Sequence, residues 1–276
     1  MIPLQDENST LQGQEAWQDP DFYAAAQEEY TVNRTGPFTF GLSSRIVFTS
    51  LQDLDQDFDI TAESLTSSSQ SDNLPSIYTK NSTLLQGYRK QLEVLQTQFR
   101  DQGAAVAEIA FGGSGAVTVS LQKPLSRGTI AINGTNPDPS LPPLLDFNAG
   151  SNEVDLQIAI KAVRKVREFM SAEALSVLGP VEVVPGADVQ SDEELEAVMR
   201  SSLYGPSFAH PVGTAAMMPR NLGGVVDSNL KVYGAEGLWV VDASVFPILP
   251  AAHTQATVYA VAEYAADKIK RESERK

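Results

Sequence analysis

The stretch FAHPVGTAAM, residues 208–217, contains His210, one of only two histidines in the chain. The other, His253, lies in the stretch PAAHTQAT, residues 250–257. Imidazole titrates closer to neutrality than any other side chain, so histidine is the usual carrier of protons in catalysis. A lone histidine is more often a core or capping residue. Both histidines here stand in dense and distinctive motifs, which favours a functional role for each.

Five motifs lie between His210 and the C-terminus: HPVGT (210–214), GGVVD (223–227), VYG (232–234), GLWVVDAS (237–244) and HTQ (253–255). With these motifs the sequence resembles the glucose-methanol-choline (GMC) family of flavin oxidoreductases, on the side of aryl-alcohol oxidase and glucose oxidase. Weaker similarity runs back to about residue 30, through TGPFT (35–39) and PLSRG (124–128). The resemblance covers most of this chain but only the C-terminal half of a family member.

The resemblance implies a role for each histidine. In the family, the histidine that aligns with His210 is the base that removes the hydroxyl proton of an alcohol. The residue at the position of His253 is a His or Asn that hydrogen-bonds the same oxygen. Two imidazoles on one oxygen allow one to accept the proton while the other donates to the developing charge. Phe208 is expected to shape the substrate pocket, with a core role as the alternative, and no metal site is expected.

The resemblance also implies contacts with FAD. Asp242 and Ala243 would meet its ribityl-pyrophosphate region, whereas His253 and Thr254 would face the isoalloxazine ring. For Asp242 the alternative is a turn or cap role after a strand. Family members place the pyrophosphate on a G-x-G-x-x-G turn at a helix N-terminus.

No G-x-G-x-x-G motif occurs in the chain. The nearest glycine cluster, GGSG at 112–115, fails the spacing and precedes an expected strand, so it is interpreted as a turn. FAD binding is therefore expected to be weak or absent unless other segments complete the site.

Three functions remain open at this stage. The first is the base-bearing C-terminal portion of a FAD-dependent alcohol oxidoreductase, which oxidises a primary or aryl alcohol. The second is a fold reused without flavin, in which the histidines perform non-redox acid/base work such as dehydration, isomerisation or cyclisation. The third is an inactive remnant or a binding module. Fold alone does not decide among them.

Composition excludes several classes of protein. The net charge is −15, and residues 1–80 contain 13 acidic and three basic side chains, which excludes nucleic-acid binding. No apolar run approaches the roughly 18 residues that a membrane helix requires. The alternating acids Asp53, Asp55, Asp57 and Asp59 lack the glycine and glutamate of a calcium loop, so an acidic solvated loop is expected instead. The absence of cysteine excludes disulfides and thiolate metal sites.

The overall pattern predicts an α+β fold, with an antiparallel sheet and flanking helices, as in the GMC substrate-binding domain. A C-terminal strand and helix would be the remnant of the FAD domain that they complete in the family. Three segments are expected. Residues 1–30 form an acidic segment without regular structure, residues 31–221 form the substrate-binding domain, and residues 222–276 contain the terminal strand and helix.

Individual elements follow from periodicity and capping signals. Helices are predicted over 82–100, 155–170 with Asp155 near the N-cap, 191–200 opening on a capping box, and 257–270. Strands at 117–121 and 130–132 are expected to be antiparallel and separated by a turn at 124–128. A short apolar strand is predicted over 237–242.

The sequence also makes a prediction about partners. The sheet that would cover the C-terminal strand and helix is absent from the chain, so their apolar faces are expected to be exposed. The residues concerned are Leu238, Val240, Val258, Val261 and Ile269. Exposed apolar patches drive association. We therefore expect a homodimer, an N-terminal partner chain or a rearranged C-terminus, together with a small-molecule substrate and neither nucleic acid nor membrane.

Overall fold

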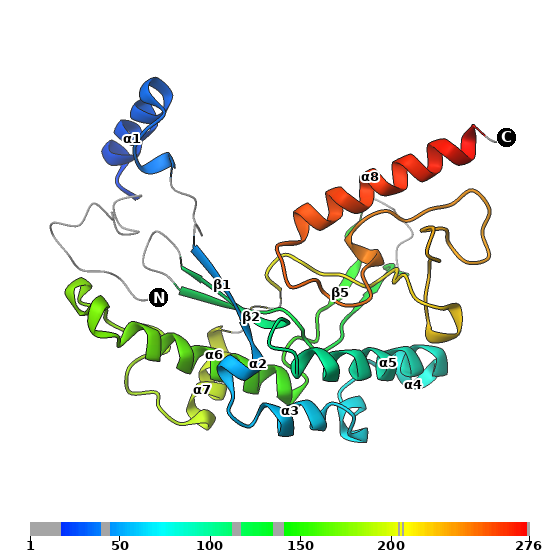
Figure 1. Ribbon diagram of the computed structural model, residues 1–276, viewed down its shortest axis with the longest axis horizontal. Helices are drawn as coiled ribbons and strands as arrows, with labels where there is room; N and C mark the ends of the chain where they lie inside the picture. Colours follow the sequence, from blue (N-terminus) through cyan, green and yellow to red (C-terminus); the bar gives the residue numbers. More distant parts are fainter. Residues whose placement is uncertain are drawn as a thin grey trace. The chain divides into compact units, whose positions relative to one another are not determined.

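The computed structural model describes residues 18–39, 45–111, 117–134, 141–203, 205 and 207–274. The chain divides into two compact units, each assembled from three separate segments (Figure 1). The first unit comprises residues 1–49, 107–121 and 158–203, and the second comprises residues 50–106, 122–157 and 204–276. The predicted division after residues 30 and 221 stays a prediction, but the segment before residue 31 was expected to lack regular structure and is helical from Pro20.

A three-stranded sheet organises the first unit, in the order β1 (Arg45–Ser50), β2 (Ala105–Phe111) and β3 (Val117–Leu121). β2 pairs antiparallel with β3, with Ile109 opposite Val119. All residues of β2 except Phe111 are buried, which makes this strand the core of the sheet. The strand predicted over 117–121 from its alternating apolar residues is confirmed. The GGSG cluster at 112–115 lies outside the described residues.

Helices complete the first unit. They are α1 (Pro20–Asn33), η2 (Pro37–Thr39), α6 (Glu153–Met170), η4 (Glu173–Leu178), α7 (Asp192–Val198) and the π-helical turn η5 (Met199–Leu203). Phe169, near the end of α6, contacts Phe111 at the end of β2, with ring centroids 5.1 Å apart. α7 opens on the predicted capping box, in which Ser191 and Glu194 satisfy each other's backbone amides.

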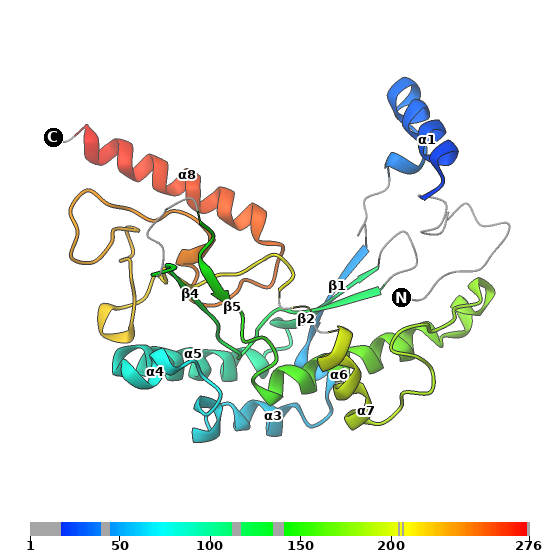
Figure 2. The ribbon, with the colours of Figure 1, turned by 180° about the vertical axis from the view of Figure 1, so that it is seen from behind.

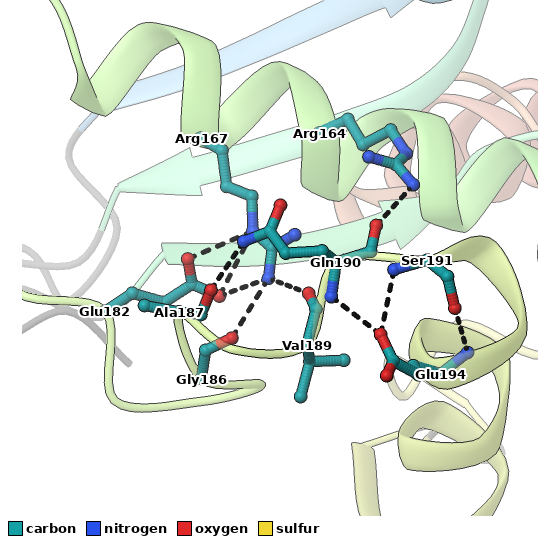
Figure 3. Close-up of polar contacts among 9 residues, drawn as sticks. All are labelled: Arg164, Arg167, Glu182, Gly186, Ala187, Val189, Gln190, Ser191 and Glu194. Atoms are coloured by element: carbon teal, nitrogen blue, oxygen red, sulfur yellow. Dashed lines mark hydrogen bonds and ion pairs between the residues drawn. The ribbon is translucent and has the colours of Figure 1, made fainter.

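The irregular segment 179–190 of the first unit is held by an arginine of α6 (Figure 3). Arg167 forms a two-pronged ion pair with Glu182 and also donates hydrogen bonds to the carbonyls of Gly186 and Val189. The side chains of Arg167 and Glu182 are only 18% and 17% exposed. Arg164, one turn earlier, pairs with Asp192 at the surface. A half-buried ion pair thus helps to fix a segment that has no regular structure.

The second unit contains a long amphipathic helix, α5 (Ser82–Phe99), as predicted from its apolar spacing. Its buried side chains include Tyr88, Leu92, Leu95 and Phe99. The other helices of this unit are α2 (Leu51–Leu54), α3 (Phe58–Ser64), η3 (Ser68–Ser71), α4 (Ser76–Lys80), η6 (Arg220–Leu222), η7 (Ala243–Val245) and α8 (Thr254–Ser273). α8 begins three residues earlier than predicted, because His253 occupies the N-cap position.

The strand pairing of the second unit differs from the prediction. The strand expected near Ile130 exists as β4 (Thr129–Ala131), but it pairs with β5 (Leu144–Asp146) in a separate ribbon that is visible in Figure 2. β3 pairs with β2 instead. The prediction failed because it assumed that consecutive strands pair with each other. The mixed helix and antiparallel-sheet class is nonetheless confirmed.

Two acidic residues make tertiary contacts that the sequence did not predict, and for Asp55 the predicted exposure to solvent is wrong. Asp55 is buried rather than solvated, and its carboxylate accepts hydrogen bonds from the Asp57 amide and the Thr61 hydroxyl. Asp155 lies in the first turn of α6, near its N-cap as predicted, but it is also buried beneath residues 125–126 and accepts their amide hydrogen bonds. Asn152 takes the local role by accepting the amide of Val154.

The predicted strand at 237–242 is not formed. Within this stretch the structure has one isolated antiparallel bridge, between Lys231 and Trp239. Residues on this stretch and on α8 pack around a small core instead of a sheet. Its buried members are Val226, Leu230, Val245, Phe246 and Ala265, and Val240, Val258 and Val261 lie partly buried against them. The expected exposure is therefore wrong for these three valines and for the partly buried Ile269, and it holds for Leu238, which is 51% exposed.

No helix in the described part of the chain is long and apolar enough to cross a membrane. The same residues contain no cluster of three or more side chains that suits a metal ion.

Candidate active site

His210 lies on an extended segment that the backbone holds in place at both ends. Ala209, directly before it, and Gly213, three residues after it, both have positive φ values, +60° and +87°. A Cβ atom at Gly213 would lie 3.2 Å from the Phe246 carbonyl oxygen, so the glycine permits a close approach of the two segments. Further along, the amides of Ala215 and Met217 donate to the carbonyls of Ser244 and Val245. The His210 segment is therefore bonded to η7.

His253 occupies the N-cap position of α8, with extended backbone angles of −62° and 122°. It follows the segment 246–252, which leads from η7 into the helix and contains two prolines. Both histidine segments are therefore linked to η7. The His210 segment is hydrogen-bonded to it, and the His253 segment follows it directly in the chain. This arrangement explains how residues 43 positions apart in the sequence come together.

The structure brings together three of the side chains predicted from the sequence. The imidazole rings of His210 and His253 have centroids 5.5 Å apart and planes inclined at 57°. The ring of Phe208 lies edge-on to both, at 6.1 Å from His210 and 6.3 Å from His253. Phe208 and His253 are exposed and His210 is half-buried. The arrangement can accept and donate protons at one small region bounded by an aromatic ring.

The residues proposed for FAD are distributed around this pair. Asp242 is exposed and caps η7, where its carboxylate accepts the amide and hydroxyl hydrogen bonds of Ser244. Within the described residues, none of its hydrogen bonds joins it to either imidazole. Ala243 begins η7, and Thr254 is buried as the first residue of α8. The cap role that was the alternative for Asp242 is thus present, and its contact with a cofactor stays a prediction.

Comparison with known proteins defines the family. Residues 124–262 match the sequence model described as GMC oxidoreductase, and the chain belongs to this family. The dehydrogenase xptC of Emericella nidulans is 43% identical over 190 residues, which cover 69% of this chain and 30% of that protein. A pyranose dehydrogenase of Agaricus campestris is 43% identical over 142 residues, 51% of this chain and 23% of that protein.

Solved structures agree with this family assignment. A FAD-dependent oxidoreductase from Chaetomium thermophilum superposes with a TM-score of 0.88 at 34% identity, over 99% of this chain and 46% of that one. A fungal aryl-alcohol oxidase gives a TM-score of 0.84 at 36% identity, over 93% and 43% of the two chains. The chain therefore spans less than half of these solved proteins and less than a third of the curated relatives that it matches.

The start of α8 fits one part of a flavin site. The His253 side chain makes no cap hydrogen bond there, and the first turn of this 20-residue helix contains no acidic residue. The positive end of the helix dipole therefore faces no local carboxylate, which suits an electron-rich group such as the polar edge of a flavin ring. Asp242 offers a carboxylate oxygen to hydroxyl groups. The described residues thus fit part of FAD, whereas the pyrophosphate turn is missing from the sequence.

Proposed function

We propose that this chain is the base-bearing C-terminal portion of a FAD-dependent GMC alcohol oxidoreductase that acts on a primary or aryl alcohol. The observation that carries the proposal is the convergence of the only two imidazoles on each other and on Phe208. Two proton-carrying groups at one exposed point suit the handling of a hydroxyl group. Membership of the GMC oxidoreductase family and the likeness to a fungal aryl-alcohol oxidase support the proposed oxidoreductase class.

In this proposal the two histidines divide the work at the alcohol oxygen. His210, half-buried, accepts the hydroxyl proton in its neutral form as the carbon–oxygen double bond forms. His253 donates an N–H hydrogen bond to the same oxygen and so stabilises its developing negative charge. FAD, when bound, supplies the acceptor for the hydride that leaves the alcohol carbon. The products are then a carbonyl compound, a proton on His210 and the reduced cofactor.

Asp242, Ala243, His253 and Thr254 would hold the cofactor in this proposal, and Phe208 would form one wall of the substrate pocket. The edge of an aromatic ring carries partial positive charge, so the edge-on ring of Phe208 suits a flat, aromatic substrate. The pyrophosphate turn would have to come from residues outside this sequence, on an N-terminal partner chain or segment, because a second copy of this chain lacks the motif too. Without it, FAD binding to this chain is weak.

The histidine pair also suits a second candidate. A flavin-free protein would use the same histidine pair for non-redox acid/base chemistry, such as a dehydration, isomerisation or cyclisation. The two candidates differ in a single observable property, which is whether flavin is retained and becomes reduced.

The test is an absorbance measurement on the purified protein, before and after incubation with FAD and removal of the unbound cofactor. Retained flavin that bleaches when benzyl alcohol is added without oxygen supports the proposal. His210→Ala should slow bleaching by about 10²–10⁴-fold, the usual contribution of a general base. The control is Lys90→Ala, which alters an exposed lysine of α5. Flavin that never bleaches, even with FAD present in excess, would support the flavin-free candidate, whereas loss of flavin on desalting alone follows from the missing turn and favours neither candidate.

A further inference from the structure

The segment 246–252, which leads into His253, is held in an unusual way. Pro247 and Pro250 have no backbone N–H, so the segment has few donors with which to join a strand or a helix. Its carbonyls are instead bound by two side chains from distant parts of the second unit. The Gln91 amide nitrogen donates to the Pro247 carbonyl at 2.8 Å, and the Lys123 ammonium donates to the Leu249 carbonyl at 2.7 Å.

Gln91, on α5, is itself fixed on its other side. Its amide oxygen accepts a hydrogen bond of 3.0 Å from Arg127. The guanidinium of Arg127 also donates to the Pro124 carbonyl and lies 5.1 Å from the ring centre of Tyr88. Because its oxygen faces a cation, the Gln91 amide must direct its nitrogen toward Pro247. The hydrogen bond to the segment therefore has a defined direction.

Lys123 is 8% exposed, although lysine is almost never buried without a partner. Burial lowers the pKa of its ammonium group. The Leu249 carbonyl, four residues before His253, offsets part of this cost, because hydrogen bonds that involve a charged group are stronger than neutral ones. Retention of a buried lysine at this point indicates that the position of the carbonyl matters.

We propose that Gln91 and Lys123 are positioning residues, which hold the 246–252 segment so that the His253 ring lies opposite His210. The His210 segment is bonded to η7 at Ser244 and Val245, immediately before the held segment. The separation of the two imidazoles therefore depends on the path of residues 246–252, which Gln91 and Lys123 fix. The effect on catalysis rests on the proposed function, whereas the effect on ring geometry does not.

Nuclear magnetic resonance can test the geometry, because the chain contains only two histidines. In untagged protein labelled on histidine, rings with centroids 5.5 Å apart should give a nuclear Overhauser cross-peak. Gln91→Met and Lys123→Met should each weaken this cross-peak several-fold. Their controls, Gln86→Met and Lys90→Met, alter exposed residues of α5, the helix that contains Gln91, and should leave the cross-peak unchanged. An unchanged cross-peak in folded Gln91→Met and Lys123→Met proteins would overturn the proposal.

A milder pair of variants covers the case in which a methionine variant fails to fold. Gln91→Asn keeps the amide but shortens its reach, and Lys123→Arg keeps the charge but changes its geometry. Both should fold, as measured by circular dichroism, and still weaken the cross-peak. An undiminished cross-peak in both would count against the proposal as firmly as the methionine result.

Kinetics separates this inference from the proposed function. If the protein oxidises alcohols, Gln91→Met should lower kcat by up to about 10²-fold, the cost of a displacement of roughly 1 Å, with little change in KM. If it does not oxidise alcohols but the cross-peak still responds, the proposed function fails and the positioning role stands. If it oxidises alcohols and neither kcat nor the cross-peak responds, the positioning role fails alone.

Discussion

Two irregular, proline-containing segments are held in contrasting ways. In the first unit, segment 179–190 is fixed by the half-buried ion pair of Arg167 and Glu182, with further bonds from Arg167 to two carbonyls. In the second unit, the Pro247 and Leu249 carbonyls of segment 246–252 are bound by Gln91 and Lys123. The first segment contributes its own charged partner, and the second contributes only backbone acceptors.

The difference follows from what each segment supports. An ion pair that is shielded from water holds a loop strongly. If one partner is removed, the other charge stays shielded from water and unpaired, which destabilises the folded state. Backbone carbonyls do not titrate, so the segment before His253 keeps its acceptors at any working pH. A segment that carries a proton-transfer group is thus held without adding an acid beside it. The following predictions break or sharpen this contrast.

The largest effect on stability is expected from Arg167→Met. The substitution leaves the Glu182 carboxylate shielded from water and without its partner, which should reduce the free energy of unfolding by about 3–5 kcal/mol. Urea denaturation measures the change. Arg164→Met is the matched control, because its pair with Asp192 is largely exposed and should contribute less than about 1 kcal/mol. Equal losses in the two variants would show that burial does not distinguish the two pairs.

Asp155→Asn should have an intermediate effect on the second unit. The two carboxylate oxygens of Asp155 accept the amides of Leu125 and Ser126, and asparagine offers only one acceptor. The unmatched amide should reduce the free energy of unfolding by about 1–3 kcal/mol. Asp155→Ala removes both acceptors and should reduce the free energy of unfolding further. If Asp155→Ala proved more stable than Asp155→Asn, the lost hydrogen bonds would not explain the destabilisation.

The same residue predicts a dependence of stability on pH. Burial raises the pKa of Asp155 above its ordinary value, although the bonds from Ser126 and Leu125 and the charge of Arg127 oppose this. A raised pKa in the folded state favours the protonated form, so the stabilising contribution is present below the ordinary aspartate pKa. It is lost as the pH rises through the raised value. Urea midpoints across this range should fall less steeply with pH in Asp155→Asn than in the wild type.

The smallest effect is expected at the end of the first held segment. Ser191→Ala removes the hydroxyl that caps α7 and should cost about 1 kcal/mol. Ser191→Thr keeps the hydroxyl and serves as the control. Thermal unfolding of both variants measures the difference, and a Thr variant as unstable as the Ala variant would point to packing in place of capping.

The sequence predicted those features that depend on local periodicity or on a specific motif. The spacing of Leu92, Leu95 and Phe99 was sufficient for α5, and Ser191 with Glu194 was sufficient for the start of α7. The histidine pair followed from family motifs and not from periodicity. Contacts between residues far apart in the sequence could not be predicted from it. β4 pairs with a strand that lies beyond residue 140, and the apolar run at 237–242 packs on a loop core where a sheet was expected.

Gln91 and Lys123 show why the site was only partly predictable. Their acceptors lie 156 and 126 residues away in the sequence. These acceptors are backbone carbonyls, which every residue has, so no residue type marks them. One signal was available: Pro247 and Pro250 remove two donors just before a catalytic candidate, so some other group must hold that segment. These prolines predict that side chains from elsewhere bind the segment, but they do not identify those side chains.

The central claim is that His210 and His253 act as one site on one oxygen. The most direct measurement is a double-mutant cycle on flavin bleaching by benzyl alcohol, with His210→Ala, His253→Ala and the double variant. Residues that act as a unit are strongly non-additive, so the double variant should lose about as much rate as the worse single variant. Losses that multiply would mean that the two histidines act independently, and would contradict the account.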